Sequence, residues 1–345
     1  MILLFVGAGG SAAVDEKQYP VARGFFEKVQ GKIKQKKLFE TVCQSIEKER
    51  LDIEDVLEVL DKLQESFMGV TSGLGEQLYT KGGVTFASER LGHTRHTNEA
   101  MRDRIVLLND DIKARVYNFY GKPPPTKKLS SWIHFLSELE QFDSCLQIFT
   151  TNYDLVLEEA TKQAGVHVNY GLDNTGRRTR LDVDFWHPPK DHLGTCGLLT
   201  KLHGSVDWQR ENDEIIVGSS HFTGEHENHC LLYPGHKGSP DTEPFISFHN
   251  HLRNVVQRKY GGLTAAVFVG YAFRDDYINA ILAELPSHLP VFIIFKFEGD
   301  LLDTGLPPTV PLSVTFAHDG SGLTEETMAR CLSYLNDQRM IADEL

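Results

Sequence analysis

Short apolar runs occur at six places along the chain and predict the strands of a buried sheet. Most of them are continuous rather than alternating, which is typical of strands covered on both faces, as in a parallel sheet. The last run alternates instead, which predicts an edge strand. The six runs are Ile2–Val6, Leu146–Phe149, Leu198–Leu202, Ala265–Val269, Val291–Phe297 and Leu312–Phe316.

Helical periodicity fills the chain between these runs. In residues 51–67 apolar positions recur at helical spacing, and Asp52 is placed to cap that helix at its N-terminus. Two further helices are predicted at 98–120 and 129–142. Residues 71–92 are rich in Gly, Ser and Thr and predict a loop between helices. Strands that alternate with helices predict an α/β fold with a parallel sheet and crossover connections.

The predicted helices of the N-terminal half lie between the first and the second strand, so they predict an insertion into the sheet. At 345 residues the chain also exceeds one ordinary domain. We therefore predict two domains. Residues 1–24 and 143–345 form the sheet domain, and residues 25–142 form an inserted helical domain.

The composition argues against several partners and compartments. A net charge of -13 disfavours a nucleic-acid backbone or an anionic membrane as the main partner. Backbone amides at a helix N-terminus can still bind a small anion. No apolar run approaches the roughly 20 residues of a membrane span. The 5 cysteines are scattered and odd in number, which favours a reducing cytoplasm over a disulfide framework.

A glycine-rich turn, Gly7–Ser11, follows the first predicted strand directly. Glycines there let the backbone approach a pyrophosphate and expose its amides. The alternative is a tight turn from strand to helix that binds no ligand. Ala12 stands where the dehydrogenase pattern Gly-x-Gly-x-x-Gly requires its third glycine, so hydride transfer is not predicted.

Polar residues also follow three later strands, at the sheet edge where α/β proteins bind ligands. Asn152 follows the second strand, and its amide can hold a ribose hydroxyl or orient a water molecule. His203 follows the third, where a neutral imidazole can act as a general base near pH 7. Residues 270–276 follow the fourth. Structural alternatives remain for these side chains: a helix N-cap for Asn152, Asp154, Asp275 or Asp276, and a carbonyl-bonded imidazole for His203.

In this order, each at a strand end, the four motifs resemble those of the Sir2 family. The family's hallmarks are Gly-Ala-Gly-x-Ser, Thr-x-Asn-x-Asp, His-Gly and a late loop of the Gly-x-Ser type. The longer forms TTNYD, KLHGS and GYAFRDD are most similar to the bacterial Sir2-like, NAD-consuming domains of anti-phage defence systems. The resemblance covers the sheet domain and not the helical insertion. It implies a Rossmann-like domain that cleaves the bond between nicotinamide and ribose in NAD.

The resemblance also implies a role for each matching residue. Asn152 would hold the ribose and orient the attacking water, and His203 would be the general base. The turn after the first strand would cradle the phosphates, and the residues after the fourth would line the adenosine. Arg23 lies in a partial echo of the sirtuin loop and would touch a phosphate. The residues implied in NAD binding are Gly7, Ala8, Gly9, Ser11, Arg23, Thr151, Asp154, Gly270 and Asp275.

The chain departs from the deacylase sirtuins in ways that change the expected reaction. Those enzymes carry a structural zinc on two Cys-x-x-Cys pairs, and this chain has no such pair. Ala272 also replaces the Ser of the Gly-x-Ser loop. Without the zinc module the groove for an acyl-lysine peptide is lost, so water becomes the expected acceptor and no metal is expected. Residues 209–262 contain Cys230 and four nearby histidines, which are His221, His226, His229 and His236. These side chains could bind zinc, but their irregular spacing favours solvated histidines in a loop.

We therefore expect an NAD+ hydrolase that acts in abortive infection. Such an enzyme must be silent until triggered, because unchecked loss of NAD kills the host. Control by a homo-oligomer or by a separate partner, such as a HerA-like ATPase, is expected. Two alternatives stay open: an NAD-dependent protein deacylase or ADP-ribosyltransferase, and a catalytically silent module that binds NAD or ADP-ribose.

Overall fold

The computed structural model contains two compact units. Met1–Tyr19, Tyr120–Leu232 and Gly238–Leu345 make up the sheet unit, and Pro20–Phe119 makes up most of the helical unit. The residues described are 1–46, 48, 51–70, 95–142, 146–173, 180–181, 197–211, 214–218, 229–232, 242–257, 262–295, 314–317 and 325–343.

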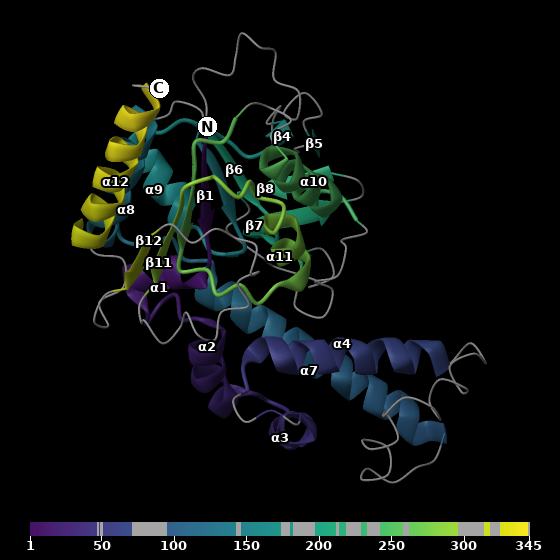
Figure 1. Ribbon diagram of the computed structural model, residues 1–345. Coiled ribbons are helices and arrows are strands. Elements are labelled where there is room, and N and C mark those ends of the chain that lie inside the picture. The colour runs from purple at the N-terminus through teal and green to yellow at the C-terminus, as the bar shows by residue number, and fades with distance from the viewer. Residues whose placement is uncertain are drawn as a thin grey trace. The chain divides into compact units, whose positions relative to one another are not determined.

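A seven-stranded parallel sheet lies at the centre of the sheet unit, in the order β12-β11-β10-β1-β2-β6-β3 (Figure 1). This is the predicted α/β, Rossmann-like arrangement, with the helical insertion between β1 and β2. All six predicted strands are confirmed, and β12 lies at an edge as its alternation predicts. The short β3 was not predicted, because two residues show no periodicity. The strands are β1 (Ile2–Val6), β2 (Gln147–Thr150), β3 (Val168–Asn169), β6 (Gly197–Lys201), β10 (Ala265–Val269), β11 (Val291–Phe295) and β12 (Val314–Ala317).

Helices cover both faces of this sheet (Figure 1). Leu3 and Phe5 of β1 pack in one core with α10 and α11. Their neighbours Ile2 and Leu4 pack in a second core with α8, α9 and α12. This burial on both faces explains why the strands are continuous apolar runs. The helices are α8 (Ser130–Phe142), α9 (Val156–Ala164), α10 (Phe245–Val256), α11 (Asp276–Leu282) and α12 (Glu325–Asp343).

Four central strands end level with one another at their carboxyl ends. Val6 pairs with Val269 on one side and with Thr150 on the other, and Thr150 pairs with Lys201. Neighbouring strands lie about 4.8 Å apart, so the four loops that follow begin side by side. The loop after β1 enters α1 (Ala8–Asp15) at once.

Two small antiparallel sheets contain the remaining strands that the structure describes in the sheet unit. Neither was predicted, because their strands are short or polar. One, in the order β8-β7-β9, begins immediately after His203. The bounds are β4 (Leu172–Asp173) and β5 (Arg180–Leu181) in one sheet, and β7 (Gly204–Glu211), β8 (Glu214–Val217) and β9 (His229–Leu231) in the other.

The helical unit is built around α4 (Ile53–Val70), which packs against its neighbours α2 and α3. The predicted cap is confirmed: Asp52 Oδ1 accepts from Glu54 N at 2.9 Å and from Asp55 N at 3.1 Å. The predicted loop at 71–92 lies outside the described residues. Among the described residues, the other helices of this unit are α2 (Ala22–Val29), η1 (Gln30–Lys32), α3 (Lys36–Ser45) and α7 (Arg95–Tyr120).

The two compact units divide the chain at Phe119 rather than at the predicted boundary of 142. The reason is α8, which follows the short η2 (Thr126–Lys128). The apolar face of α8, including Trp132 and Phe135, is buried in the core of the sheet unit. A helix predicted from its amphipathic pattern alone does not reveal which core receives its apolar face.

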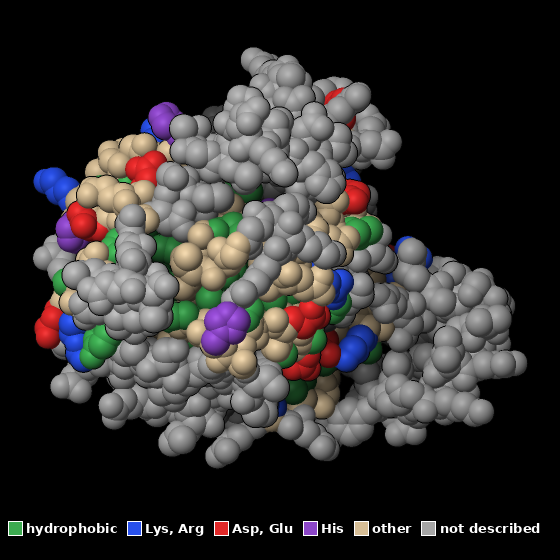
Figure 2. Space-filling view, turned by 45° about the horizontal axis from the view of Figure 1, so that its top comes forward, with side chains coloured by type: hydrophobic (Ala, Val, Ile, Leu, Met, Phe, Trp, Pro, Cys, Tyr) green, Lys and Arg blue, Asp and Glu red, His purple; other side chains and the backbone are tan. Residues whose placement is uncertain are grey.

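Charged side chains of both signs are mixed over the described surface of the face drawn in Figure 2. The large apolar side chains that the structure describes as exposed are Val21, Leu107 and Tyr334. Within the described part of the chain, no helix combines the length and the apolar character needed to cross a membrane.

Candidate functional site

The loops after β1 and β10 pack backbone against backbone. Gly7 N donates to Val269 O at 3.0 Å, and Gly9 N donates to Gly270 O at 2.9 Å. Gly270 has a φ of +59°, and a Cβ there would lie 2.3 Å from Gly10 N. The close approach of these two loops therefore explains the glycines. Ala8, in the first turn of α1, is exposed.

The Asn152 side chain ties the end of β2 to the loop after β1. It is 7% exposed. Its Nδ2 donates to the Gly7 carbonyl oxygen at 2.9 Å and to Ser11 Oγ at 2.9 Å. Because an amide nitrogen has two hydrogens, both donors are used, and only the acceptor Oδ1 remains for a ligand or a water. The Gly7 carbonyl fixes this orientation, since a flipped amide would place two acceptors together.

The same network continues from Ser11 to Asp154. The Ser11 hydroxyl is hydrogen-bonded to the Asp154 carboxylate, and Asp154 Oδ1 accepts from Val156 N at 3.0 Å. Burial raises the pKa of Asp154 above its ordinary value, and the nearby Lys201 opposes that shift. Asp154 therefore links the Ser11–Asn152 network to the start of α9. Its expected role toward NAD stays a prediction.

His203 and Asp275 form a buried pair at the carboxyl edge. His203 Nε2 lies 3.2 Å from Asp275 Oδ2, and the two side chains are 3% and 5% exposed. Asp275 also caps α11, because its Oδ1 accepts from Ile278 N at 3.0 Å. The predicted cap is confirmed. The sequence did not show that the same carboxylate reaches a histidine 72 positions away.

A second histidine, which the sequence reasoning missed, lies over His203. The ring of His249 in α10 stacks on that of His203, with 6.4 Å between centroids and 25° between planes. His249 Nδ1 lies 2.8 Å from the Phe245 carbonyl oxygen. Burial lowers the pKa of His249 to about 4, and repulsion from His203 adds to that shift. The only available signal was its position in the amphipathic segment FISFHNHL.

The Lys201 side chain binds the backbone of the loop after β2. This lysine is completely buried, and its Nζ donates to the Asp154 carbonyl oxygen at 2.5 Å. It also pairs with Glu158 Oε1 at 2.5 Å. One cation therefore joins the end of β6 to the loop that carries Asn152. The sequence reasoning included Lys201 in the KLHGS motif but assigned it no role.

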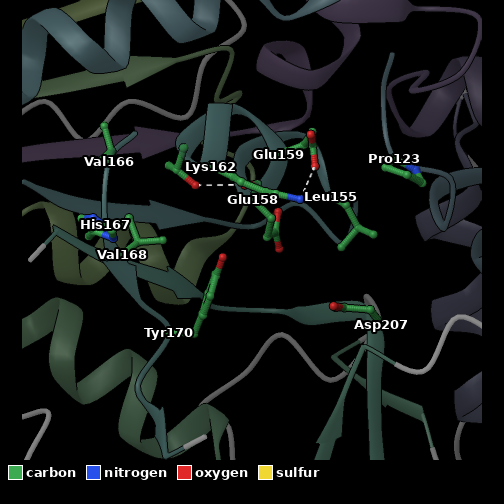
Figure 3. Close-up of a pocket in the computed structure, with 11 residues that line it drawn as sticks. Pro123, Leu155, Glu158, Glu159, Lys162, Val166, His167, Val168, Tyr170 and Asp207 are labelled. Carbon is green, nitrogen blue, oxygen red and sulfur yellow. Dashed lines mark hydrogen bonds and ion pairs between the residues drawn. The ribbon is translucent and has the colours of Figure 1, made fainter. Parts of the chain in front are cut away.

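A pocket of about 370 Å3 is lined in part by Glu158, the partner of Lys201 (Figure 3). Glu158, Tyr170 and Asp207 contribute to its walls, and the Tyr170 hydroxyl points toward Glu158 (Figure 3). Burial raises the pKa of Glu158 to about 7; Lys201 opposes this shift and Asp207 reinforces it. None of the site residues predicted from the sequence lines this pocket.

The remaining predicted residues are placed as follows. Thr151 is half-buried beside Asn152, and its N donates to the Val6 carbonyl oxygen at 3.3 Å. Arg23 lies in α2 of the helical unit and pairs with Glu27 at 3.3 Å. Within the sheet unit, hydrogen bonds join Gly7, Asn152, Ser11 and Asp154 in one network, Gly9 to Gly270, and His203 to Asp275 in a separate pair.

The region of the missing zinc module is described only in part. Cys230 is buried and not in a disulfide, and burial raises the pKa of its thiol to about 11. His221, His226 and His236 lie outside the described residues. Among the side chains that the structure does describe, no three of His, Cys, Asp and Glu gather closely enough to hold a metal ion.

Residues 146–296 match the family model described as SIR2-like domain. The match spans β2 to β11 and includes Asn152, His203, Gly270 and Asp275, but not the glycine-rich turn after β1. No curated protein sequence matches the chain. The match supports the Sir2-like resemblance of the sheet unit. Sir2-like domains use NAD, so the match suggests an NAD-dependent enzyme.

Proposed function

We propose that the protein is an NAD+ hydrolase, which uses water to split NAD+ into nicotinamide and ADP-ribose. One observation carries the proposal. Asn152 is fixed by two hydrogen bonds so that only its acceptor Oδ1 remains for a ligand, and it lies in the loop beside that of His203. Together with the SIR2-like match over this segment, this favours a ribose or water site at the end of β2.

The residues present suit this reaction. When nicotinamide leaves, positive charge develops at the anomeric carbon of the ribose, and water must attack there. Asn152 Oδ1 would accept a hydrogen bond from the ribose or the water. His203 would take the proton released as the new bond forms. The N-terminus of α1, which follows β1 directly, favours the negatively charged pyrophosphate.

Water is the acceptor that fits this chain best. The two Cys-x-x-Cys pairs of deacylase sirtuins are missing from the sequence. Cys230, the one cysteine in that region, is buried and has a raised thiol pKa, so it is a poor metal ligand. Without that module, no zinc-supported groove is available to hold an acyl-lysine peptide against the ribose.

We further propose a role as a defence effector whose activity is released in an assembly. This rests on the resemblance of TTNYD, KLHGS and GYAFRDD to domains of anti-phage systems. A homo-oligomer or a HerA-like ATPase partner would supply the control that NAD loss demands. Light scattering of the purified chain, alone and with that ATPase, would measure assembly. A monomer in both conditions would contradict the proposal.

The test of the activity is nicotinamide release from NAD+ by the wild type, Asn152→Ala and His203→Ala. We expect each substitution to slow release by about 10²–10⁴-fold, because each removes a group that acts on the ribose or the water. Asn109→Ala is a matched control. Asn109 is also a buried asparagine whose Nδ2 makes two hydrogen bonds, to Asp61 and Gln64, but it lies in the helical unit.

Three results would contradict the proposed roles. Unchanged release in both site variants would remove Asn152 and His203 from the reaction. An equal loss in Asn109→Ala would show that the effect is general destabilisation. Absence of release from the wild type in every assembly tested, with cleavage of acyl-lysine peptides instead, would favour the deacylase alternative.

A further inference from the structure

Both carboxylate oxygens of Asp275 bond to groups of the protein. Oδ1 accepts from Ile278 N at 3.0 Å at the start of α11, and Oδ2 lies 3.2 Å from His203 Nε2. The carboxylate is 5% exposed and the imidazole 3%. The N-terminus of α11 favours a negative charge at this position. Asp275 is therefore placed as an ionised acceptor between a helix and a histidine.

This contact decides which nitrogen of His203 carries the proton. An ionised carboxylate accepts hydrogen bonds and cannot donate them. The nitrogen that faces it, Nε2, must therefore be the N–H of the neutral ring. The lone pair then lies on Nδ1, since neutral imidazole has one donor and one acceptor. The hydrogen bond from Nε2 to Asp275 therefore defines both the tautomer and the orientation of the His203 ring.

The loop that carries Asp275 is held rigidly. Phe273, a buried non-glycine residue, has a φ of +53°, a conformation that persists only where neighbours enforce it. Asn279 Nδ2 donates to the Phe273 carbonyl oxygen at 2.7 Å, and Tyr271 Oη donates to Asn279 Oδ1 at 3.4 Å. These bonds define where the chain turns into α11, and so where the Asp275 carboxylate points.

We propose that Asp275 is a positioning residue that keeps His203 in its Nε2–H tautomer, so that Nδ1 is the nitrogen that accepts the proton during NAD+ hydrolysis. The catalytic half of this statement rests on the proposed function, whereas the tautomer does not. The role differs from the adenosine-lining role that the resemblance implies for Asp275, because its two oxygens already bond to protein groups.

The test is Asp275→Asn. Asparagine is a good N-cap, so its Oδ1 can still accept from Ile278 N. Its Nδ2 then faces His203 Nε2 with a donor, which favours the opposite tautomer. We expect kcat to fall by about 10⁴-fold, the effect of changing a carboxylate that orients a catalytic histidine to an amide. KM for NAD+ should change by no more than about twofold, since the substrate contacts are kept.

A matched control and a direct readout complete the test. Asp52→Asn makes the same change at the cap of α4 in the helical unit, and we expect wild-type kinetics from it. Nitrogen-15 NMR of the histidine rings, with His203→Gln to assign the signal, should show Nε2–H for His203 in the wild type and Nδ1–H in Asp275→Asn.

The outcomes separate this inference from the proposed function. Nε2–H in the wild type together with no NAD+ cleavage in any assembly would keep the tautomer assignment and reject the hydrolase. An Nδ1–H signal in the wild type would overturn the inference even if NAD+ is cleaved. A raised KM with unchanged kcat in Asp275→Asn would also overturn it, because Asp275 would then be a ligand of the substrate.

Discussion

Polar groups at the carboxyl edge of the sheet bond to partners far along the chain, whereas the cap of α4 in the helical unit bonds within a few residues. Asn152 reaches Gly7, which lies 145 positions away. Asp52 caps α4 through Glu54 and Asp55, two and three positions away. The same residue types occur in both regions. In this protein, the polar residues of the candidate site differ from an ordinary helix cap in that they also hold a second loop.

Of the substitutions that test this comparison, Gly270→Ala is expected to cause the largest loss of unfolding free energy. A Cβ there would lie 2.3 Å from Gly10 N and 2.4 Å from the Gly9 carbonyl carbon, and φ is +59°. The left-handed backbone and the forced separation of the loops should together lower the free energy of unfolding by about 4 kcal/mol. Urea denaturation measures this loss, and nicotinamide release should disappear with it.

Gly165→Ala is the matched control for that prediction. Gly165 ends α9 with a φ of +74°, and a Cβ there would meet nothing within 4 Å. Only the backbone term applies, so we expect a loss of about 1–2 kcal/mol. Equal losses of unfolding free energy at the two glycines would show that the contact between the loops adds nothing to stability, which would contradict the prediction.

The strands and the edge motifs could be predicted because their signals are local. A strand buried on both faces is a continuous apolar run, and this pattern gave all six predicted strands. The same holds for Asp52 and Asp275, whose capping role follows from the helix that comes next. Strand β3 and the small antiparallel sheets are short or polar, so they carry no comparable signal.

The rest of the site depends on tertiary contacts that no local pattern contains. Nothing in the segment GYAFRDD shows that Asp275 meets His203, 72 positions earlier. Likewise, nothing in KLHGS shows that Lys201 is buried against Glu158. His249 belongs to an amphipathic helix in which a histidine is ordinarily a core residue, and only the fold stacks it on His203.

Two adjacent glutamates of α9 differ in the same way, because one bonds to a distant partner and the other to a near one. Glu158 pairs with Lys201, 43 positions away, whereas Glu159 accepts from Gln163 at 2.7 Å, one turn along the same helix. Burial raises the pKa of Glu158 from 4.5 to about 7. The folded protein thus binds this proton more tightly than the unfolded chain. Glu158 contributes stability below pH 4.5 that is lost as the pH rises through 7.

Glu158→Gln should remove that dependence. Between pH 4.5 and about 7, the unfolding free energy of the wild type should fall by roughly 3 kcal/mol through Glu158. The variant should lack this decrease. Urea titrations across the window measure the slope. Glu159→Gln should follow the wild-type curve. A Glu158→Gln curve parallel to the wild type would mean that Glu158 ionises in the folded state as it does in water.

The smallest expected effect concerns two serines. Ser11 Oγ accepts from Asn152 Nδ2 at 2.9 Å and bonds to Asp154, so Ser11→Ala leaves a buried donor and a buried carboxylate each without one partner. We expect a loss of about 1–2 kcal/mol, and slower nicotinamide release because the Asn152 amide is held by one bond instead of two.

Ser45 is the local counterpart, since its Oγ donates to the Val42 carbonyl oxygen at 2.7 Å, three positions away, at the end of α3. It is exposed, so water replaces the lost bond in Ser45→Ala and we expect a change within about 0.5 kcal/mol. The difference between the two variants measures what the long-range bond at the sheet edge adds. Equal unfolding free energies with slower release in Ser11→Ala alone would assign Ser11 to orienting Asn152 rather than to stability. If Ser11→Ala and Ser45→Ala have the same unfolding free energy and the same rate of nicotinamide release, the hydrogen bonds of Ser11 contribute to neither property.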